Sequence, residues 1–251
     1  MTATVTEIWR HPIKSHGHER IDQVALSAGE CLPWDRRWAV AHERSCFDTD
    51  RPRWEPCSEF SIGAKSPRLQ AIQCVTDPAF RCLTLSHPDR PDLTIDPDDE
   101  GDANRFIQWV MPISNGSRLL PARLVRAEAP MTDTDYQSIS LINLASHRDV
   151  EAQVGHSLDA RRWRGNFNID GLEPWQEHDL IGRRLRLGAA EVEVRERIKR
   201  CNATMVDPET GEKDANTLAA LRDGFGHTDC GVYAVVTKSG LVQQDDLVEV
   251  L

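Results

Sequence analysis

The sequence predicts a mainly β chain with some helix, of the α+β class, and three observations support this. Short runs of alternating apolar and polar residues recur along the whole chain, as in half-buried strands. Turn-forming residues separate these runs about every eight to twelve positions. Helical spacing is confined to a few places and does not alternate strictly with the strands. This pattern is typical of closed or sandwiched β-sheet rather than of a Rossmann arrangement.

The first half of the chain reads as short strands between loops rich in proline, glycine and aspartate. Residues 102–110 are an exception with helical spacing, because Phe106 and Val110 share one face and Pro112 ends the run. We also expect a short helix near residues 57–63 and an irregular connection at 87–97. The strands predicted in this half are residues 4–9, 20–26, 38–41, 69–75, 81–86 and 121–125.

A polar stretch at residues 128–136 is the best candidate for a linker, because it is short of apolar side chains. It predicts a domain of residues 1–127 followed by a second domain of residues 128–251. The second half also contains a helix at 145–154, ended by Gly155, and a short helix at 218–221. A loop is expected at 173–178 and a turn at Gly240. The strands predicted in this half are residues 139–144, 167–169, 183–187, 191–197, 231–237 and 246–251.

Composition excludes several classes of protein. The chain is 39% hydrophobic and 28% charged, as soluble globular proteins are. Its longest apolar runs have the length of strands, so no membrane span is expected, and the first residues lack the features of a signal peptide. The seven cysteines are scattered without a C-x-x-C pair. These features predict a reducing, cytoplasmic setting, and they disfavour a structural zinc site.

The charge distribution suggests the kind of ligand. A net charge of −10 argues against nucleic-acid binding, which needs a basic surface. Arginines nevertheless cluster at residues 161–164 and 195–200. Guanidinium groups bind phosphate bidentately, so an acidic chain with such clusters suits a small anionic ligand in a pocket. The alternative for each cluster is a solvated surface with salt bridges.

The loop at residues 11–17 is a second candidate anion site. Pro12 fixes one backbone dihedral and Gly17 frees another, so the loop has a defined shape. Lys14 and Ser15 could hold an anion together within it. A polar surface turn is the alternative explanation for this pair.

Cys201 is the candidate reactive centre. It follows a predicted strand and several cations, and turn-forming residues come soon after it. A cationic environment lowers the pKa of a thiol toward the thiolate that attacks electrophiles and binds metals. The alternative is a small buried hydrophobic residue, as most free cysteines are. A pairing of Cys201 with a histidine for nucleophilic catalysis has no support in the local sequence.

Three stretches in order, residues 11–15 (HPIKS), 163–166 (WRGN) and 200–211 (RCNATMVDPETG), resemble the MOSC family. The family is the molybdenum-cofactor sulfurase C-terminal-type domain, and Asp35-Arg36 matches its usual N-terminal partner. The resemblance covers almost the whole chain and implies a MOSC-type β-barrel with a smaller N-terminal β-barrel-like domain. The sequence departs from the family at Gly165, where proline is frequent, which predicts a looser turn, and at Met205, where a second threonine is frequent.

Within this family, the chain resembles the amidoxime-reducing enzymes. The resemblance implies an oxidoreductase with a molybdenum cofactor (Mo-molybdopterin) that reduces N-hydroxylated compounds such as amidoximes and hydroxylamines. It implies that electrons come from a separate ferredoxin- or cytochrome-type protein with its reductase. The residues that it implies are Cys201 as catalytic residue and molybdenum ligand, Lys14, Ser15 and Arg36 at the cofactor's phosphate, Arg164 and Asn166 at the pterin, and Arg200 and Thr204 close to the metal.

Two other functions remain open at this point. Cys201 could carry a persulfide in a sulfur-transfer reaction. The chain could also carry or insert the cofactor without turning over a substrate. Neither nucleic acid nor a membrane is expected as a partner.

Overall fold

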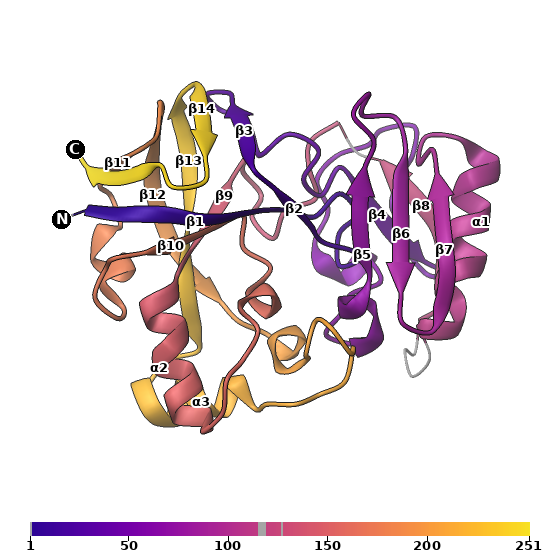
Figure 1. The fold of residues 1–251 in the computed structure, drawn as a ribbon. Helices are drawn as coiled ribbons and strands as arrows, with labels where there is room; N and C mark the ends of the chain where they lie inside the picture. Colours follow the sequence, from indigo (N-terminus) through magenta and orange to yellow (C-terminus); the bar gives the residue numbers. More distant parts are fainter. Residues whose placement is uncertain (1, 115–118, 127) are drawn as a thin grey trace.

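The computed structural model describes residues 2–114, 119–126 and 128–251. The chain forms a larger barrel lobe and a smaller lobe (Figure 1). The predicted class, mainly β with some helix, is confirmed, and the described residues contain three α-helices. These are α1 (Glu100–Val110), α2 (Leu144–Val154) and α3 (Thr217–Phe225).

The barrel lobe consists of seven strands in the order β10-β9-β13-β12-β11-β15-β1, and pairing of β10 with β1 closes the barrel. Because successive side chains of a strand point to opposite faces, one face of each strand lies inside the barrel, where Val192 and Val194 of β12 are fully buried. The short strand β2 (Glu19–Ile21) extends β1 at one edge. The barrel strands are β1 (Thr2–Arg10), β9 (Ile139–Asn143), β10 (Phe167–Asp170), β11 (Arg184–Leu187), β12 (Ala190–Lys199), β13 (Asp229–Lys238) and β15 (Leu247–Val250).

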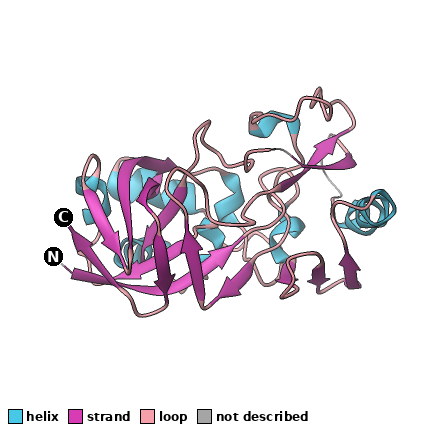
Figure 2. Ribbon diagram, turned by 90° about the horizontal axis from the view of Figure 1, so that it is seen from above, coloured by secondary structure: helices cyan, strands magenta, loops and turns pink. Residues whose placement is uncertain are grey.

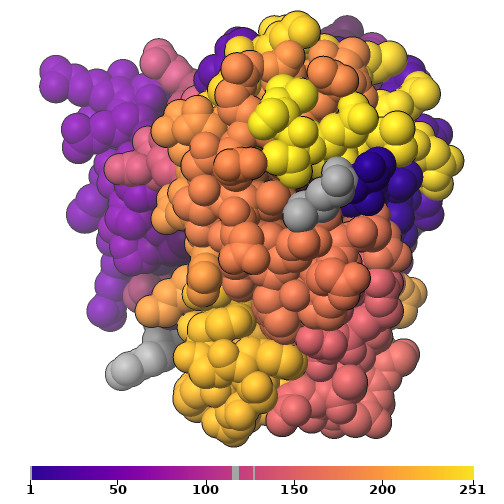
Figure 3. Space-filling model, turned by 90° about the vertical axis from the view of Figure 1, so that its left-hand side faces the viewer, coloured from indigo at the N-terminus to yellow at the C-terminus, as the bar shows by residue number. Residues whose placement is uncertain are grey.

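The first strand of the chain therefore belongs to a barrel built mainly from the second half. The short strand β3 (Gln23–Leu26) likewise pairs with β14 (Gly240–Gln243) near the other end of the chain. Figure 3 shows the barrel face on which the indigo start of β1 lies beside the yellow C-terminal strands. The predicted division between residues 127 and 128 stays a prediction, and residue 127 lies outside the described residues.

The smaller lobe contains two sheets and α1. One sheet pairs β4 (Trp38–His42) with β8 (Pro121–Arg126), and the other joins β5 (Gln73–Thr76), β6 (Leu83–His87) and β7 (Arg90–Ile95). The Asp99 side chain caps α1 by accepting a hydrogen bond from the amide of Asp102 at 2.9 Å. The predicted apolar face of α1 is buried, with Phe106 and Val110 in the core of this lobe.

Several predicted elements differ from the structure. The strand expected at 20–26 is divided at Asp22 into β2 and β3, and only the end of 69–75 is a strand, because Pro67 starts a 3₁₀ turn there. The connection expected at 87–97 contains β7, an edge strand whose exposed polar side chains and Pro91 hid its pairing with β6. The expected turn at Gly240 opens β14, and part of the expected loop at 173–178 is a 3₁₀ helix.

The two lobes are joined by hydrogen bonds from Thr76 of the smaller lobe to Glu19, whose buried carboxylate also pairs with Arg10 inside the barrel lobe. The Glu19 carboxylate accepts hydrogen bonds from Arg10 of β1 at 2.7 and 2.9 Å. The same carboxylate accepts bonds from the amide and hydroxyl of Thr76 on β5, both at 2.7 Å. Figure 2 shows the lobes from above, with loops filling the region between them. These loops carry most of the candidate functional residues.

Candidate functional site

Seven of the eight predicted site residues line one cavity between the lobes. Lys14, Ser15 and Arg36 come from the first loops of the chain, and the others come from the barrel lobe. Gln70 and Gly63 of the smaller lobe form part of the wall. Residues more than one hundred positions apart in sequence thus share one site. The seven are Lys14, Ser15, Arg36, Arg164, Arg200, Cys201 and Thr204.

Three of these residues have a left-handed backbone conformation. The φ angles are 63° at Ser15, 51° at Arg36 and 50° at Arg164. Each such non-glycine position costs about 1 kcal/mol or more, and these conformations concentrate at ligand-binding sites. The tight turns that result direct these three residues into one cavity.

Lys14 is buried and its ammonium group is fully engaged. It donates to the carbonyl oxygens of Met131 at 2.8 Å and Thr132 at 3.3 Å, and it forms an ion pair with Asp133. Partial desolvation in the cavity opposes ionisation of Asp133, but the charges of Lys14 and Arg36 outweigh it and hold the pKa of this carboxyl well below its usual range. The stretch expected to be a linker is therefore fastened to the site, with Met131 and Thr132 buried.

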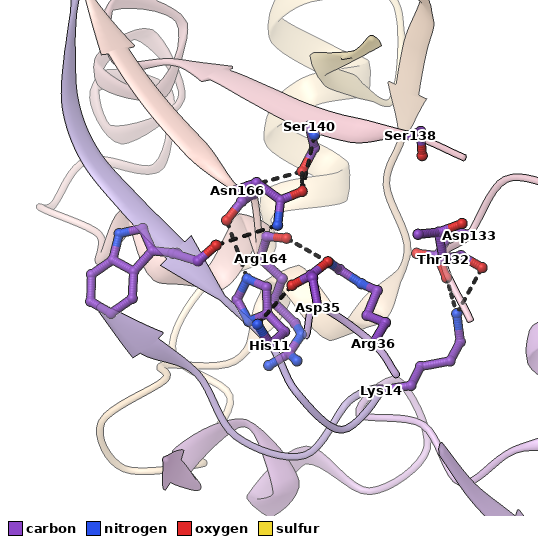
Figure 4. A network of polar contacts seen from close by, with 12 residues as sticks. His11, Lys14, Asp35, Arg36, Thr132, Asp133, Ser138, Ser140, Arg164 and Asn166 are labelled. Atoms are coloured by element: carbon purple, nitrogen blue, oxygen red, sulfur yellow. Dashed lines mark hydrogen bonds and ion pairs between the residues drawn. The ribbon is translucent and has the colours of Figure 1, made fainter. Parts of the chain in front are cut away.

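Arg36 is held between its neighbour Asp35 and the turn that carries Arg164. Its guanidinium forms an ion pair with the buried carboxylate of Asp35 and donates to the carbonyl oxygen of Arg164 at 2.8 Å. The other oxygen of Asp35 accepts the backbone amide of His11 at 2.7 Å. The side chain of His11 contacts the carbonyl oxygen of Gly165 at 3.2 Å. Figure 4 shows this network, which ties three separate loops together.

Arg164 has no carboxylate partner among the described residues. Its guanidinium donates to the side-chain oxygen of Gln70 at 3.3 Å and to the carbonyl oxygen of Gly17 at 3.1 Å. Burial, followed by repulsion from Arg36, lowers the pKa of Arg164 to about 9. A half-buried cation with only neutral acceptors favours an incoming anion, because charge-assisted hydrogen bonds strengthen at low dielectric.

Cys201 lies where strand β12 ends and a short 3₁₀ helix (Asn202–Met205) begins. Its side chain is exposed, so the thiol is accessible to a ligand. The Thr204 hydroxyl donates to the Cys201 carbonyl oxygen at 3.0 Å and also contacts the Thr217 hydroxyl at 2.8 Å. Thr204 is itself buried. It therefore fixes the backbone that carries the thiol.

Arg200 bonds to backbone carbonyl oxygens and pairs with no carboxylate among the described residues. Its guanidinium donates to the carbonyl oxygen of Cys230 at 2.8 Å and to that of Trp163 at 2.8 Å, and it lies 5.4 Å from the centre of the Trp163 ring. Trp163 directly precedes Arg164. Arg200 thereby connects the Cys201 loop to the turn that carries Arg164.

Asn166 lies behind the cavity instead of lining it. Its side-chain oxygen accepts hydrogen bonds from the amide and hydroxyl of Ser140 at 3.0 and 2.9 Å, and its nitrogen donates to the Trp9 carbonyl oxygen at 3.3 Å. These bonds join β1, β9 and β10 beneath the site. The expected contact of Asn166 with a cofactor stays a prediction.

The turn at Gly165 is tightly packed, and the looser turn expected from the sequence is wrong. A Cβ atom on Gly165 would lie 2.2 Å from the Cγ1 atom of Ile142. Gly165 is also buried and its carbonyl oxygen is bonded to His11. Glycine at this position lets the Arg164 turn approach β9 closely.

Three further residues line the cavity that were not named as site residues from the sequence, although Arg162 belongs to the arginine cluster noted there. Arg162 lies within the arginine cluster and forms a bidentate ion pair with Asp214 at 2.8 and 3.0 Å. The thiol of Cys57 donates to Asp133 at 3.1 Å, and burial raises its pKa to about 11. Asp133 stood in the stretch that looked like a linker. Their roles depend on partners distant in sequence, which local patterns do not reveal.

The fold and the site together define a two-lobed β-barrel protein whose cavity combines an exposed thiol with an uncompensated guanidinium. The MOSC domain model matches residues 129–249, and the MOSC N-terminal beta barrel domain model matches residues 2–114. The chain therefore belongs to the MOSC-domain proteins, with the N-terminal barrel domain that the sequence led us to expect.

Two curated relatives are both molybdenum cofactor sulfurases from nematodes. The Caenorhabditis briggsae protein is 39% identical over 84 residues, and the Caenorhabditis elegans protein is 44% identical over 87. These matches cover 34% and 33% of this chain but only 11% and 12% of the relatives. The crystal structure of the YUAD protein from Bacillus subtilis covers 100% of this chain and 96% of its own, at 12% identity and a TM-score of 0.48.

No helix within the described residues is long and apolar enough to cross a membrane. Within the same residues, no three or more histidine, cysteine, aspartate or glutamate side chains are grouped as they would be to hold a metal.

Proposed function

We propose that this chain binds the molybdenum cofactor and reduces N-hydroxylated compounds such as amidoximes and hydroxylamines. The observation that carries the proposal is the cavity that unites the Cys201 thiol with the cationic Arg164 turn. A thiolate is a soft ligand suited to a metal centre, and an uncompensated guanidinium suits a phosphate. The family membership and the sulfurase relatives support a function related to this cofactor.

The residues present fit the proposed cofactor. Arg164 lacks a carboxylate partner, and the Ser15 hydroxyl lines the same cavity without a hydrogen bond to any described residue. The resemblance implies Lys14, Ser15 and Arg36 at the terminal phosphate and Arg164 at the pterin. Because Lys14 is already paired with Asp133, we propose instead that Arg164 holds the phosphate together with Ser15, with Arg36 beside them. The Cys201 thiolate would bind the metal, and the cofactor's own dithiolene would supply further ligands. Asn166 would act by holding the strands beneath the Arg164 turn.

The cofactor would supply the two-electron chemistry that removes oxygen from the substrate. The chain's own contribution is position and charge. Thr204 and Arg200 restrain the backbone on either side of Cys201, so that the residue is held at the cavity. Electrons would come from a separate ferredoxin- or cytochrome-type protein with its reductase. A reducing cytoplasm would keep the Cys201 thiol free to bind a metal.

The test is metal content combined with turnover. Protein produced in a host that makes the cofactor should contain about one molybdenum per chain by elemental analysis, since one thiolate supports one site. It should reduce benzamidoxime with an artificial electron donor, and Cys201→Ala should abolish the reduction. Cys46→Ala is the matched control, because Cys46 is also exposed but does not line the cavity. Full activity of Cys201→Ala, or protein without molybdenum, would refute the proposal.

A sulfur-transfer reaction is the second candidate, favoured by the two sulfurase relatives. In this case Cys201 would carry a persulfide, and its exposed side chain would be open to an acceptor. Mass spectrometry should then find one extra sulfur on the Cys201 peptide, removable by cyanide, in protein without bound metal. Bound pterin with neither reaction would instead indicate a cofactor carrier.

A further inference from the structure

The cations that line the cavity divide into two groups. In the first group, each side chain is neutralised by a carboxylate. These pairs are Lys14 with Asp133, Arg36 with Asp35 and Arg162 with Asp214. In the second group, Arg164 and Arg200 bond only to neutral oxygens among the described residues. Lys199 is a third lining cation without a carboxylate partner among the described residues.

Lys199 differs from the other cations of the cavity because its ammonium makes no hydrogen bond or ion pair with any described residue. It is exposed, and it is the last residue of β12, two positions before Cys201. Asp229 lies opposite it in the strand register, but no ion pair joins the two. Asp133, the carboxylate that lines the cavity, is already bonded to Lys14 and Cys57. The ammonium is therefore available to a ligand at the exposed edge of the cavity, which also carries the exposed Cys201 and which we call its mouth.

Part of the wall of this cavity is apolar. Ile62, Ala64 and Ala203 line the same cavity and are partly exposed. An apolar surface beside one free cation is complementary to a small organic molecule with one anionic group. The deeper cation, Arg164, belongs to a different turn, so the cavity has cationic groups for two separate anions.

We propose that the mouth of the cavity selects small organic substrates that carry a carboxylate or a similar anionic group, and that Lys199 binds this group beside Cys201. The part of this inference that concerns substrates rests on the proposed reductase function. The anion preference itself is a property of the mouth and needs neither cofactor nor turnover.

The first experiment measures this preference in protein without cofactor. Anionic iodoacetate and neutral iodoacetamide both alkylate Cys201. Peptide mass spectrometry gives the ratio of the iodoacetate rate to the iodoacetamide rate. Lys199→Gln should lower this ratio at Cys201 about threefold or more, and added salt should reduce the difference. A change in thiol reactivity would affect both reagents and cancel in the ratio. Cys46, exposed elsewhere, is the internal standard.

Lys238→Gln is the matched control, because Lys238 is exposed near the far end of β13 and the substitution changes the net charge equally. It should leave the ratio at Cys201 unchanged. An equal ratio in wild-type protein and Lys199→Gln would overturn the inference. An equal fall in the Lys238 control would also overturn it, because the effect would then come from net charge.

The second experiment uses the cofactor-loaded enzyme. For wild-type protein and Lys199→Gln, kcat/KM is compared between benzamidoxime and its 4-carboxy derivative. Lys199→Gln should lower the preference for the carboxylate about fivefold. An unchanged preference would contradict the role of Lys199. If neither compound is reduced, the proposed reductase function fails, and the alkylation ratio still decides whether the mouth selects anions.

Discussion

At the scale of single residues, Arg164 carries a structural cost that a ligand would relieve. It has a left-handed backbone, bonds only to neutral oxygens among the described residues, and has a pKa lowered by burial and by Arg36. Groups that oppose stability in this way concentrate at functional sites. Lys14 and Arg36 were also predicted as cationic site residues, but each of them forms an ion pair with a carboxylate.

Arg164→Gln should therefore weaken cofactor binding without lowering the stability of the fold. We expect the pterin content of the purified protein to fall at least tenfold, because a charge-assisted phosphate contact is lost. The midpoint of thermal unfolding should not decrease, because removal of an uncompensated cation relieves repulsion with Arg36. Pterin fluorescence after oxidation and calorimetry measure the two effects. Arg186→Gln, on the barrel surface, is the control and should retain the cofactor. Normal pterin content in Arg164→Gln would contradict this role.

At the scale of elements, the first loop is both the sequence motif and the support of the site. His11, His16 and His18 are all buried there, with pKa values below the usual one mainly because of burial. The pKa of His16 is about 4, and its ring bonds to the Lys14 carbonyl oxygen at 2.7 Å. These imidazoles are therefore neutral in the folded chain near neutral pH.

This predicts a loss of stability in mild acid. Between about pH 6.5 and pH 4 the unfolded chain binds protons that the folded chain does not, so the free energy of unfolding falls as the pH falls. His16 alone would contribute on the order of 3 kcal/mol across this window. Urea unfolding at several pH values measures the slope, and His16→Asn should reduce it. A slope that is the same in wild-type protein and this variant would show that His16 does not titrate in this way.

Prediction of the elements succeeded where alternation or helical spacing was strong. The helix at 102–110 and the hairpin of β11 and β12 have clear periodicity and lie close to their expected positions. Strand β7 was missed because an edge strand exposes polar side chains, and its formation depends on pairing with β6. For the same reason, β14 was taken as a turn, although pairing with β3 makes it a strand.

At the scale of the whole molecule, the barrel depends on the first strand of the chain. β1 pairs with both β10 and β15, and it buries Ala3, Val5 and Ile8 in the barrel core. A chain of residues 128–251 lacks this strand, so β10 and β15 would each lose one of their two partners and the barrel would be left open. Its apolar core would also lose about 1.5–3 kcal/mol for each large side chain that is missing.

We therefore expect residues 128–251 alone not to unfold cooperatively in a thermal melt followed by circular dichroism. Addition of a peptide of residues 2–21, which contains β1 and β2, should restore part of the strand signal. A peptide of the same composition in scrambled order is the control. Cooperative unfolding of residues 128–251 without any peptide would show that the second half is an independent domain.

The amino-acid sequence was enough to predict the fold class, the positions of most strands along the chain, and the motifs that identify the MOSC family. It also determined Cys201 and most of the cations, because these depend on residue type and local spacing. The tertiary structure decided which cations are neutralised and which are free. Lys14 meets Asp133 and Arg162 meets Asp214, whereas Arg164 and Lys199 meet no carboxylate among the described residues. Ion pairing depends on neighbours in space, which lie far apart in the chain and leave no periodic signal.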